Sequence, residues 1–172
     1  MIGGDLRSRV INFPDAQDLR PTPDRVRETL FNWLGQTLYG KTCLDLFSGS
    51  GALGFEAASR GAEQVVMIEK NPAVYRTLQD NIRKLACLNI AAYCQDGIEF
   101  AARDVKRYDV IFLDPPFHSD YLPGLLEILP QRLTEKGVLY IESGEAITIP
   151  PPWQVLKSKR AGQVIYQLLK IA

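Results

Sequence analysis

Short apolar runs alternate with amphipathic stretches from about residue 41 onward. The runs that predict strands cover residues 42–47, 64–69, 89–94, 108–113 and 137–142. The last two lack polar alternation, which is typical of central strands covered by helices on both faces. The clearest helix is predicted over 72–86, where an apolar stripe follows the start signal Asn71-Pro72. This alternation predicts an α/β fold with a doubly wound, mainly parallel sheet.

The C-terminal end does not continue this alternation of strands and helices. Residues 153–159 and 163–171 are strand-like runs joined by Arg160-Ala161-Gly162. Two such runs around a short glycine-containing turn predict an antiparallel hairpin. With the five parallel strands, this C-terminal hairpin makes a seven-stranded sheet.

The front of the chain also lies outside the alternation. Residues 2–4 and 7–13 predict a small hairpin, and residues 24–38 predict a helix. We therefore divide the chain into an N-terminal hairpin-helix extension, residues 1–40, and a main domain, residues 41–172.

Composition narrows the class of protein. A chain of 172 residues with 46% hydrophobic residues fits one globular core, and no apolar run is long enough to span a membrane. Cys43, Cys87 and Cys94 lie among apolar neighbours without C-x-x-C spacing, which favours reduced thiols in the cytoplasm. With His118 as the single histidine, a zinc site is not expected, and nothing resembles a signal peptide.

A glycine-rich loop follows the first predicted strand. Gly49, Gly51 and Gly54 form G-x-G-x-x-G directly before a predicted helix. Glycines permit a tight turn and a close approach to a ligand, and the helix offers free N–H groups. Glu69 ends the second strand, where a carboxylate can accept both hydroxyl groups of a ribose. The alternative is a structural turn with an exposed Glu.

Two classes of cofactor fit such a loop, dinucleotides and S-adenosylmethionine, and two further acidic residues distinguish between them. Asp45 precedes the loop, where a carboxylate would repel a pyrophosphate but attract the sulfonium and ammonium groups of S-adenosylmethionine. Asp96 follows the third strand and can accept from the adenine amino group. The carboxyl ends of parallel strands share one edge of a sheet, so these acids should converge there.

The fourth strand ends in Asp114-Pro115-Pro116-Phe117. Two prolines hold the backbone away from helix and remove two N–H donors. The Asp114 carboxylate and the Pro115 carbonyl can then accept from an exocyclic amino group, and Phe117 offers a face for base stacking. The alternative is a strand terminator with Asp114 as a helix cap.

Together, the glycine loop and the Asp-Pro-Pro-Phe motif resemble the S-adenosylmethionine-dependent amino-methyltransferases, which have a Rossmann-like, class I fold. Within that class, the chain is most similar to the RsmD-type bacterial enzymes that methylate N2 of a guanine in 16S ribosomal RNA. The stretches that carry this similarity are residues 2–4 with Arg7 and Arg9, 20–22 with 24–28, 30–34, 44–54 with Glu56, 59–62, 112–117 and 162–168. The family usually has Arg-Gly-Arg where this chain has Arg7-Ser8-Arg9.

The resemblance implies an enzyme with S-adenosylmethionine as methyl donor, S-adenosylhomocysteine as product and no metal. Its expected partner is 16S rRNA, free or in an assembled small-subunit particle, and the expected state is a cytoplasmic monomer without membrane contact. The expected catalytic residues are Asp114, Pro115 and Phe117. The expected cofactor-binding residues are Thr22, Asp45, Gly49, Gly51, Glu69 and Asp96. Three other functions stay open: adenine-N6 methylation of DNA, a noncatalytic RNA-binding or cofactor-sensing module, and, more distantly, a dehydrogenase.

The charge distribution adds an RNA-binding hypothesis. The 20 Lys+Arg and 20 Asp+Glu cancel, but residues 153–172 hold four basic residues and no acid, so this tail is +4 and the rest of the chain is −4. A modest basic patch favours recognition of a shaped RNA over binding of long phosphate backbones. The candidate RNA contacts, expected to meet beside the Asp-Pro-Pro-Phe motif, are Arg7, Arg9, Lys157, Lys159 and Arg160.

Overall fold

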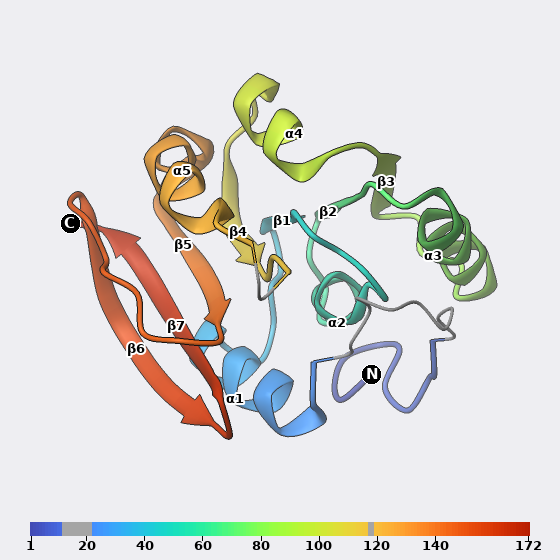
Figure 1. The fold of residues 1–172 in the computed structure, drawn as a ribbon. Helices are drawn as coiled ribbons and strands as arrows, with labels where there is room; N and C mark the ends of the chain where they lie inside the picture. Colours follow the sequence, from blue (N-terminus) through green and yellow to red (C-terminus); the bar gives the residue numbers. More distant parts are fainter. Residues whose placement is uncertain (12–21, 117–118) are drawn as a thin grey trace.

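The fold is a seven-stranded sheet with helices on both faces (Figure 1). The computed structural model describes residues 1–11, 22–116 and 119–172. The strand order is β3-β2-β1-β4-β5-β7-β6, and every pair among β1 to β5 is parallel, whereas β7 runs antiparallel to both β5 and β6. This confirms the predicted doubly wound sheet and its C-terminal hairpin. The strands are β1 (Thr42–Asp45), β2 (Gln64–Glu69), β3 (Ile90–Cys94), β4 (Tyr108–Leu113), β5 (Leu133–Ser143), β6 (Trp153–Ala161) and β7 (Val164–Ile171).

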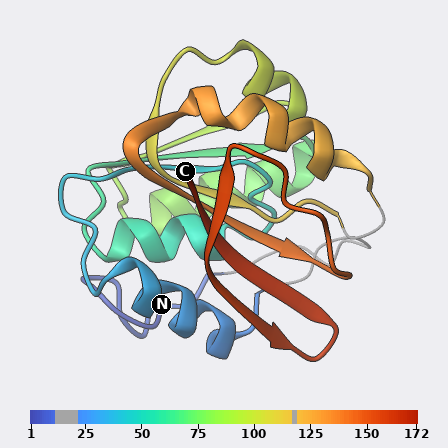
Figure 2. The same cartoon turned by 90° about the vertical axis from the view of Figure 1, so that its left-hand side faces the viewer.

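The helices form two layers around this sheet (Figures 1 and 2). The helices are α1 (Asp24–Leu34), α2 (Ala52–Ser59), α3 (Pro72–Lys84), α4 (Gly97–Arg103) and α5 (Tyr121–Ile128), with a short 3-10 helix η1 (Leu129–Arg132). Side chains of α1, α2 and α3 form one apolar core with one face of the sheet, where Phe31 of α1 meets Phe112 of β4 at 5.9 Å between ring centroids. Side chains of α4 and α5 form a second core on the other face. Burial on both faces explains why β4 and β5 lack polar alternation.

Two helix ends differ from prediction. Helix α3 begins as expected, because the Asn71 side chain accepts hydrogen bonds from the backbone N–H groups of Ala73 and Val74. It ends at Lys84, two residues before the predicted end. Helix α1 ends at Leu34 and not at 38, because Gly35 adopts a φ of 104° that no helix continues through.

The N-terminal segment, residues 1–11, contains turns and no strand. Its ends still meet: the Met1 amino group donates to the Arg9 carbonyl at 2.6 Å, and Ser8 N–H donates to the Met1 carbonyl at 3.0 Å. The predicted hairpin is therefore a closed loop as far as residue 11, and its remaining residues, 12 and 13, lie outside the described part of the chain. Ser8 has a φ of 67°, the left-handed region that suits the glycine usual at this position in the resembling family.

This segment packs on α2. The buried Glu56 carboxylate accepts from the backbone N–H groups of Ile2 and Gly3, at 2.8 and 3.3 Å, and Ser59 Oγ accepts from Leu6 N–H at 2.9 Å. Arg60 lies 3.6 Å from Glu56 and balances its charge. Whether the boundary at residue 40 separates two units stays a prediction.

The cysteines differ in exposure. Burial, together with the nearby Asp109 and Asp45 charges, raises the pKa of the Cys43 thiol to about 12, and burial also raises the pKa of Cys87. Both are protonated near neutral pH. Cys94 is exposed at the end of β3, and all three cysteines are free. Across the described ranges, no helix is long and apolar enough to cross a membrane, and no group of three or more His, Cys, Asp or Glu residues could hold a metal.

Candidate active site

The site lies at the carboxyl edge of the sheet. The strand order reverses between β1 and β4. Strands β2 and β3 extend the sheet on one side of β1, whereas β4 and β5 extend it on the other side. Ligands of doubly wound folds bind at such a switch point. Asp45 ends β1, Glu69 ends β2, Asp96 follows β3 and Asp114 follows β4. The structure therefore brings these four predicted residues to one edge.

The glycine loop is shaped by two backbone requirements. Gly49 and Gly51 have φ values of 52° and 85°, which favour glycine, and Gly51 is the N-cap of α2. Gly54 meets a packing limit, because a Cβ there would lie 2.3 Å from the Met67 methyl carbon and 3.1 Å from Asp45 Oδ2. The loop thus turns through two positive-φ glycines at its start and packs closely against β1 and β2 at its end.

Asp45 is the most buried acid of the site. Its side chain accepts from Gly54 N–H at 3.1 Å, and the residue is 2% exposed. Burial raises its pKa from 3.8 to about 7, and the Glu69 and Glu142 charges act in the same direction, while the Gly54 hydrogen bond opposes them. A cationic ligand would compensate this charge. The buried carboxylate therefore fits a positively charged group such as a sulfonium.

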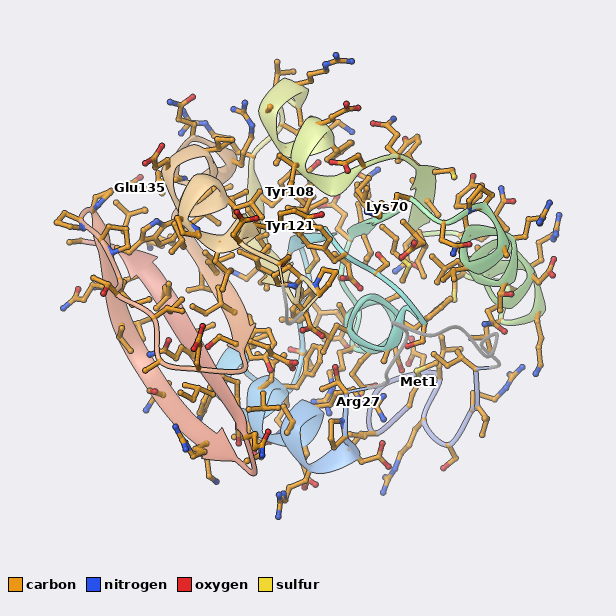
Figure 3. All side chains as sticks on the ribbon, in the orientation of Figure 1. Met1, Arg27, Lys70, Tyr108, Tyr121 and Glu135 are labelled. Atoms are coloured by element: carbon orange, nitrogen blue, oxygen red, sulfur yellow. The ribbon has the colours of Figure 1, made fainter. Side chains whose placement is uncertain are left out.

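Glu69 connects the ends of β1 and β2. Its Oε1 accepts from Gly49 N–H at 3.2 Å and its Oε2 from Asn71 N–H at 2.7 Å. The side chain is only partly buried, so the oxygens face the loop where a ribose would lie. Figure 3 labels Lys70, the next residue, and Tyr121 of α5 on either side of this edge.

Asp96 already has a structural role. Its Oδ1 accepts from the N–H groups of Ile98 and Glu99, at 2.9 and 3.1 Å, and so caps α4. Sequence reasoning missed this cap, although Asp before a short apolar helix is the common N-cap pattern. The proposed contact with adenine would have to use the other carboxylate oxygen.

Asp114 lies after β4 and does not cap the next helix. It directly follows β4, and its Oδ1 is buried. The N-cap of the next helix, α5, is Asp120, so the helix-cap alternative for Asp114 is wrong. Pro115 is buried and Pro116 exposed, whereas Phe117 lies outside the described residues.

Comparison with known proteins assigns the family. The family model described as Conserved hypothetical protein 95 matches residues 1–170. The chain belongs to this family. It is 39% identical to the protein of Escherichia coli strain K12 named ribosomal RNA small subunit methyltransferase D, over 98% of this chain and 87% of that protein. The Haemophilus influenzae protein of the same name is 37% identical, over 98% and 91% of the two chains. The solved structure of yhhF from Escherichia coli matches with a TM-score of 0.90 and 39% identity, over 99% and 96% of the chains.

Family membership confirms the RsmD-type resemblance of the sequence.

Two further residues at the carboxyl edge of the sheet were missed by sequence reasoning. Phe47, in the loop after β1, stacks on Tyr121 with ring centroids 6.0 Å apart, and it also borders Gly97. The second feature is Glu142, buried near the end of β5, which accepts from the Tyr140 hydroxyl at 2.6 Å. An acid that closes an apolar strand was the available signal, as it was for Asp45.

The candidate RNA contacts fall into two groups. Strand register aligns Glu142 with Tyr166 and Tyr166 with Lys159, so the exposed β6 residues reach the carboxyl edge. Arg7 and Arg9 are also exposed, but the N-terminal segment and the β6–β7 turn lie on opposite sides of α1 (Figure 1). Lys157, Lys159 and Arg160 lie on the strand β6 that flanks the edge. Whether Arg7 and Arg9 join them in one patch stays a prediction.

The last predicted cofactor residue, Thr22, is buried. It is 8% exposed and lies two residues before α1, on the core side of the sheet that α1 covers. Its contact with a cofactor stays a prediction.

Proposed function

We propose that this protein transfers a methyl group from S-adenosylmethionine to the exocyclic N2 of a guanine in small-subunit ribosomal RNA. The observation that carries the proposal is the position of Asp114 at the switch point, beside the glycine loop, in a chain whose relatives are named ribosomal RNA small subunit methyltransferase D. The free 16S rRNA and the assembled small-subunit particle are both substrates to be tested, with the protein acting as a cytoplasmic monomer.

The cofactor half of the site consists of Asp45, the Gly49–Gly51 turn, Glu69 and Asp96. Asp45 would hold the cationic methionine end, and the partly exposed Glu69 would accept from the ribose hydroxyls. S-adenosylmethionine supplies an electrophilic methyl group, whose bond to sulfur breaks as the exocyclic nitrogen attacks and S-adenosylhomocysteine forms. Thr22 would cover the carboxylate of the methionine end.

The base half of the site consists of Asp114, Pro115 and Phe117. The Asp114 carboxylate and the Pro115 carbonyl accept from the two N–H bonds of the amino group, which turns the nitrogen lone pair toward the methyl donor. Phe117 would stack on the base. Once methylated, the nitrogen is cationic and acidic, and it would release its extra proton to water. No strong base is needed, so positioning and polarisation carry most of the rate.

Transfer of a labelled methyl group tests the proposal. Purified protein is incubated with labelled S-adenosylmethionine and rRNA or small-subunit particles that lack the modification, and the methylated nucleotide is identified by mass spectrometry. We expect N2-methylguanine at one position. Asp114→Ala should lose at least about a hundredfold in rate, because acceptors at the reacting nitrogen act in the transition state.

The controls separate the alternatives. Asp80→Ala changes an exposed acid on α3 and should methylate like the wild type. Methylation of duplex DNA at adenine would identify the DNA-methylating alternative, and cofactor binding without turnover on any nucleic acid would identify the noncatalytic one. Equal rates for Asp114→Ala and wild type would contradict the proposed role of the motif.

A further inference from the structure

Strand β6 is an exposed edge of the sheet, and its basic side chains are divided unevenly between its two faces. The strand carries Lys157, Lys159 and Arg160, and all three are exposed. Neither lysine forms an ion pair with a residue in the described part of the chain. Residues 153–172 contain no acid, so no neighbour on β6 or β7 balances these charges. Unbalanced charges on an open surface are available to a partner of opposite charge.

A β-bulge decides which face the lysines occupy. Val155 pairs with Leu169, whose side chain belongs to the core under α4 and α5. The register then shifts, and Lys157 pairs with Leu168, whose side chain belongs to the core on the opposite face. Paired residues of neighbouring strands project from the same face. Without the shift, strict alternation from Val155 would put Lys157 and Lys159 on the face of α4 and α5.

One row of the sheet connects Lys159 with the site. Lys159 pairs with Tyr166 across β6 and β7, and Tyr166 pairs with Glu142 across β7 and β5. Glu142 follows the residue of β5 that pairs with the last residue of β4, so Asp114 continues the row. At about 4.8 Å between adjacent strands, the row is about 15 Å long. Lys159 is therefore within reach of an RNA strand whose target base lies at Asp114.

Arg160 projects from the other face. It follows Lys159 directly along the strand, and successive side chains of a strand alternate, whereas Lys157 is two residues away and shares the face of Lys159. Helix α1 borders this face, because Trp33 stacks on Tyr166 with ring centroids 5.4 Å apart. Figures 1 and 2 show α1 beside the hairpin of β6 and β7. The two lysines thus lie between α1 and the open edge of the sheet.

Lysines on an edge strand also have a structural use, since they deter pairing with another chain. That use is independent of the face from which they project, and it requires no bulge. Bulges near active sites typically re-aim side chains. Lys157 and Lys159 are about 7 Å apart along the strand, and two like charges on one face suit a polyanion with repeated phosphate groups.

We propose that Lys157 and Lys159 form a phosphate-binding pair that holds the strand of small-subunit rRNA next to the target guanine, and that Arg160 is not part of it. This inference rests on the proposed function, which supplies the RNA, and it identifies the face over which the RNA passes. Lysines bind phosphates as point charges and do not read the sequence. The pair therefore adds affinity and orients the strand, whereas the choice of base belongs to the site at Asp114.

The salt dependence of rRNA binding tests the pair. Binding of unmodified small-subunit rRNA is measured by filter retention from about 50 to about 200 mM KCl for the wild type, Lys157→Ala/Lys159→Ala and Arg160→Ala. Each lost phosphate contact lowers the slope of log K against log salt by about 0.7–0.9. The double variant should lose about 1.4–1.8 in slope, so its affinity should fall about tenfold less than that of the wild type over this range. Arg160→Ala should keep the wild-type slope.

A variant with a relocated charge is the matched control. Ser158→Lys combined with Lys159→Ser keeps the composition, the net charge and a lysine on the edge strand, but it moves that charge to the opposite face. It should lose about 0.7–0.9 in slope, as one lost contact does. A wild-type slope would overturn the inference, because only the total charge of β6 would then matter. All these positions are exposed, so the fold should be kept, and Tm checks this on the same samples.

The outcomes separate this inference from the proposed function. A wild type that methylates rRNA, with a double variant that binds it with the wild-type slope, would overturn the phosphate-binding pair alone. A wild type that transfers no methyl group to rRNA would overturn the proposed function, and the slopes would still identify the face that holds RNA. Weaker binding of the double variant to assembled particles, with an unchanged slope on free rRNA, would overturn the pair in favour of an acidic protein partner. At saturating rRNA the double variant should keep the wild-type kcat, since the lysines contact no reacting atom.

Discussion

Replacing Asp45 with Asn removes one buried charge and keeps the shape of the side chain. The residue is 2% exposed, and burial raises its pKa from 3.8 to about 7. At about 1.4 kcal/mol per pKa unit, keeping the carboxyl ionised at pH 8 costs the folded protein about 4 kcal/mol. Asn can still accept from Gly54 N–H, so the substitution isolates the charge.

The direction of the pH dependence follows from proton binding. The unfolded chain releases the Asp45 proton near pH 4, whereas the folded protein holds it until about pH 7. Between these values the folded state binds more protons, so this contribution to the free energy of unfolding is full below pH 4 and falls as the pH rises to about 7. Without ligand, Asp45→Asn should therefore become progressively more stable than wild type over this range. For a chain of this size the gain in Tm at pH 8 is about 10 °C.

Ligand affinity should change in the opposite sense. S-adenosylmethionine and S-adenosylhomocysteine share the amino and carboxyl groups, and only the first carries the sulfonium charge. The ratio of their affinities, measured by calorimetry, should rise about tenfold for the wild type between pH 5.5 and pH 8. A tenfold change corresponds to about 1.4 kcal/mol, which is less than the attraction between a nearby cation and carboxylate at an effective dielectric of about 20. The ratio should stay flat for Asp45→Asn and follow the wild type for Asp80→Asn on α3. A flat wild-type ratio, or an Asn variant that gains no stability at pH 8, would refute this reasoning.

Four further substitutions test the surroundings of the site. Glu56→Gln should lower the free energy of unfolding in urea by about 3 kcal/mol, because Arg60 is left buried without its counter-charge. Gly54→Ala should cost about 1–3 kcal/mol in the same assay and weaken S-adenosylmethionine binding, and an unchanged free energy of unfolding would contradict the close packing there. Ser8→Gly should raise thermal stability by about 1 kcal/mol by relieving its left-handed φ. Lys159→Ala should weaken rRNA binding and lower the slope of log K against log salt by about 1, whereas a slope equal to wild type would exclude a phosphate contact.

The strands were predictable because each depends on local burial. The run at Tyr108–Leu113 has apolar residues on both faces, and the sheet covers both faces with helices. Helix ends depend on single backbone angles that the apolar pattern does not contain. Gly35 ends α1 with a positive φ, although apolar residues continue beyond it and Leu38 is still buried.

The parts of the site that could be predicted are those where the local backbone geometry admits few residue types. The backbone has a positive φ at Gly49 and Gly51, which favours glycine, and Asp114 lies between the end of β4 and two prolines. Glu142 was not predicted because its meaning depends on the register of β4 with β5, which is a relation between segments about thirty residues apart. The position of the N-terminal segment relative to β6 is a relation of the same kind, since helix α1 lies between these segments from opposite ends of the chain (Figure 1).

Helix α2 connects the two halves of the proposed function. Its N-cap, Gly51, belongs to the glycine loop, and its Glu56 and Ser59 hold the N-terminal segment through hydrogen bonds to Ile2, Gly3 and Leu6. Every residue of this helix is buried, so it can shift only as a rigid unit with its neighbours. A ligand that orders the glycine loop therefore also stabilises the position of a segment that carries two exposed arginines. If Arg7 and Arg9 contact RNA as the sequence predicts, α2 would therefore couple that contact to cofactor binding.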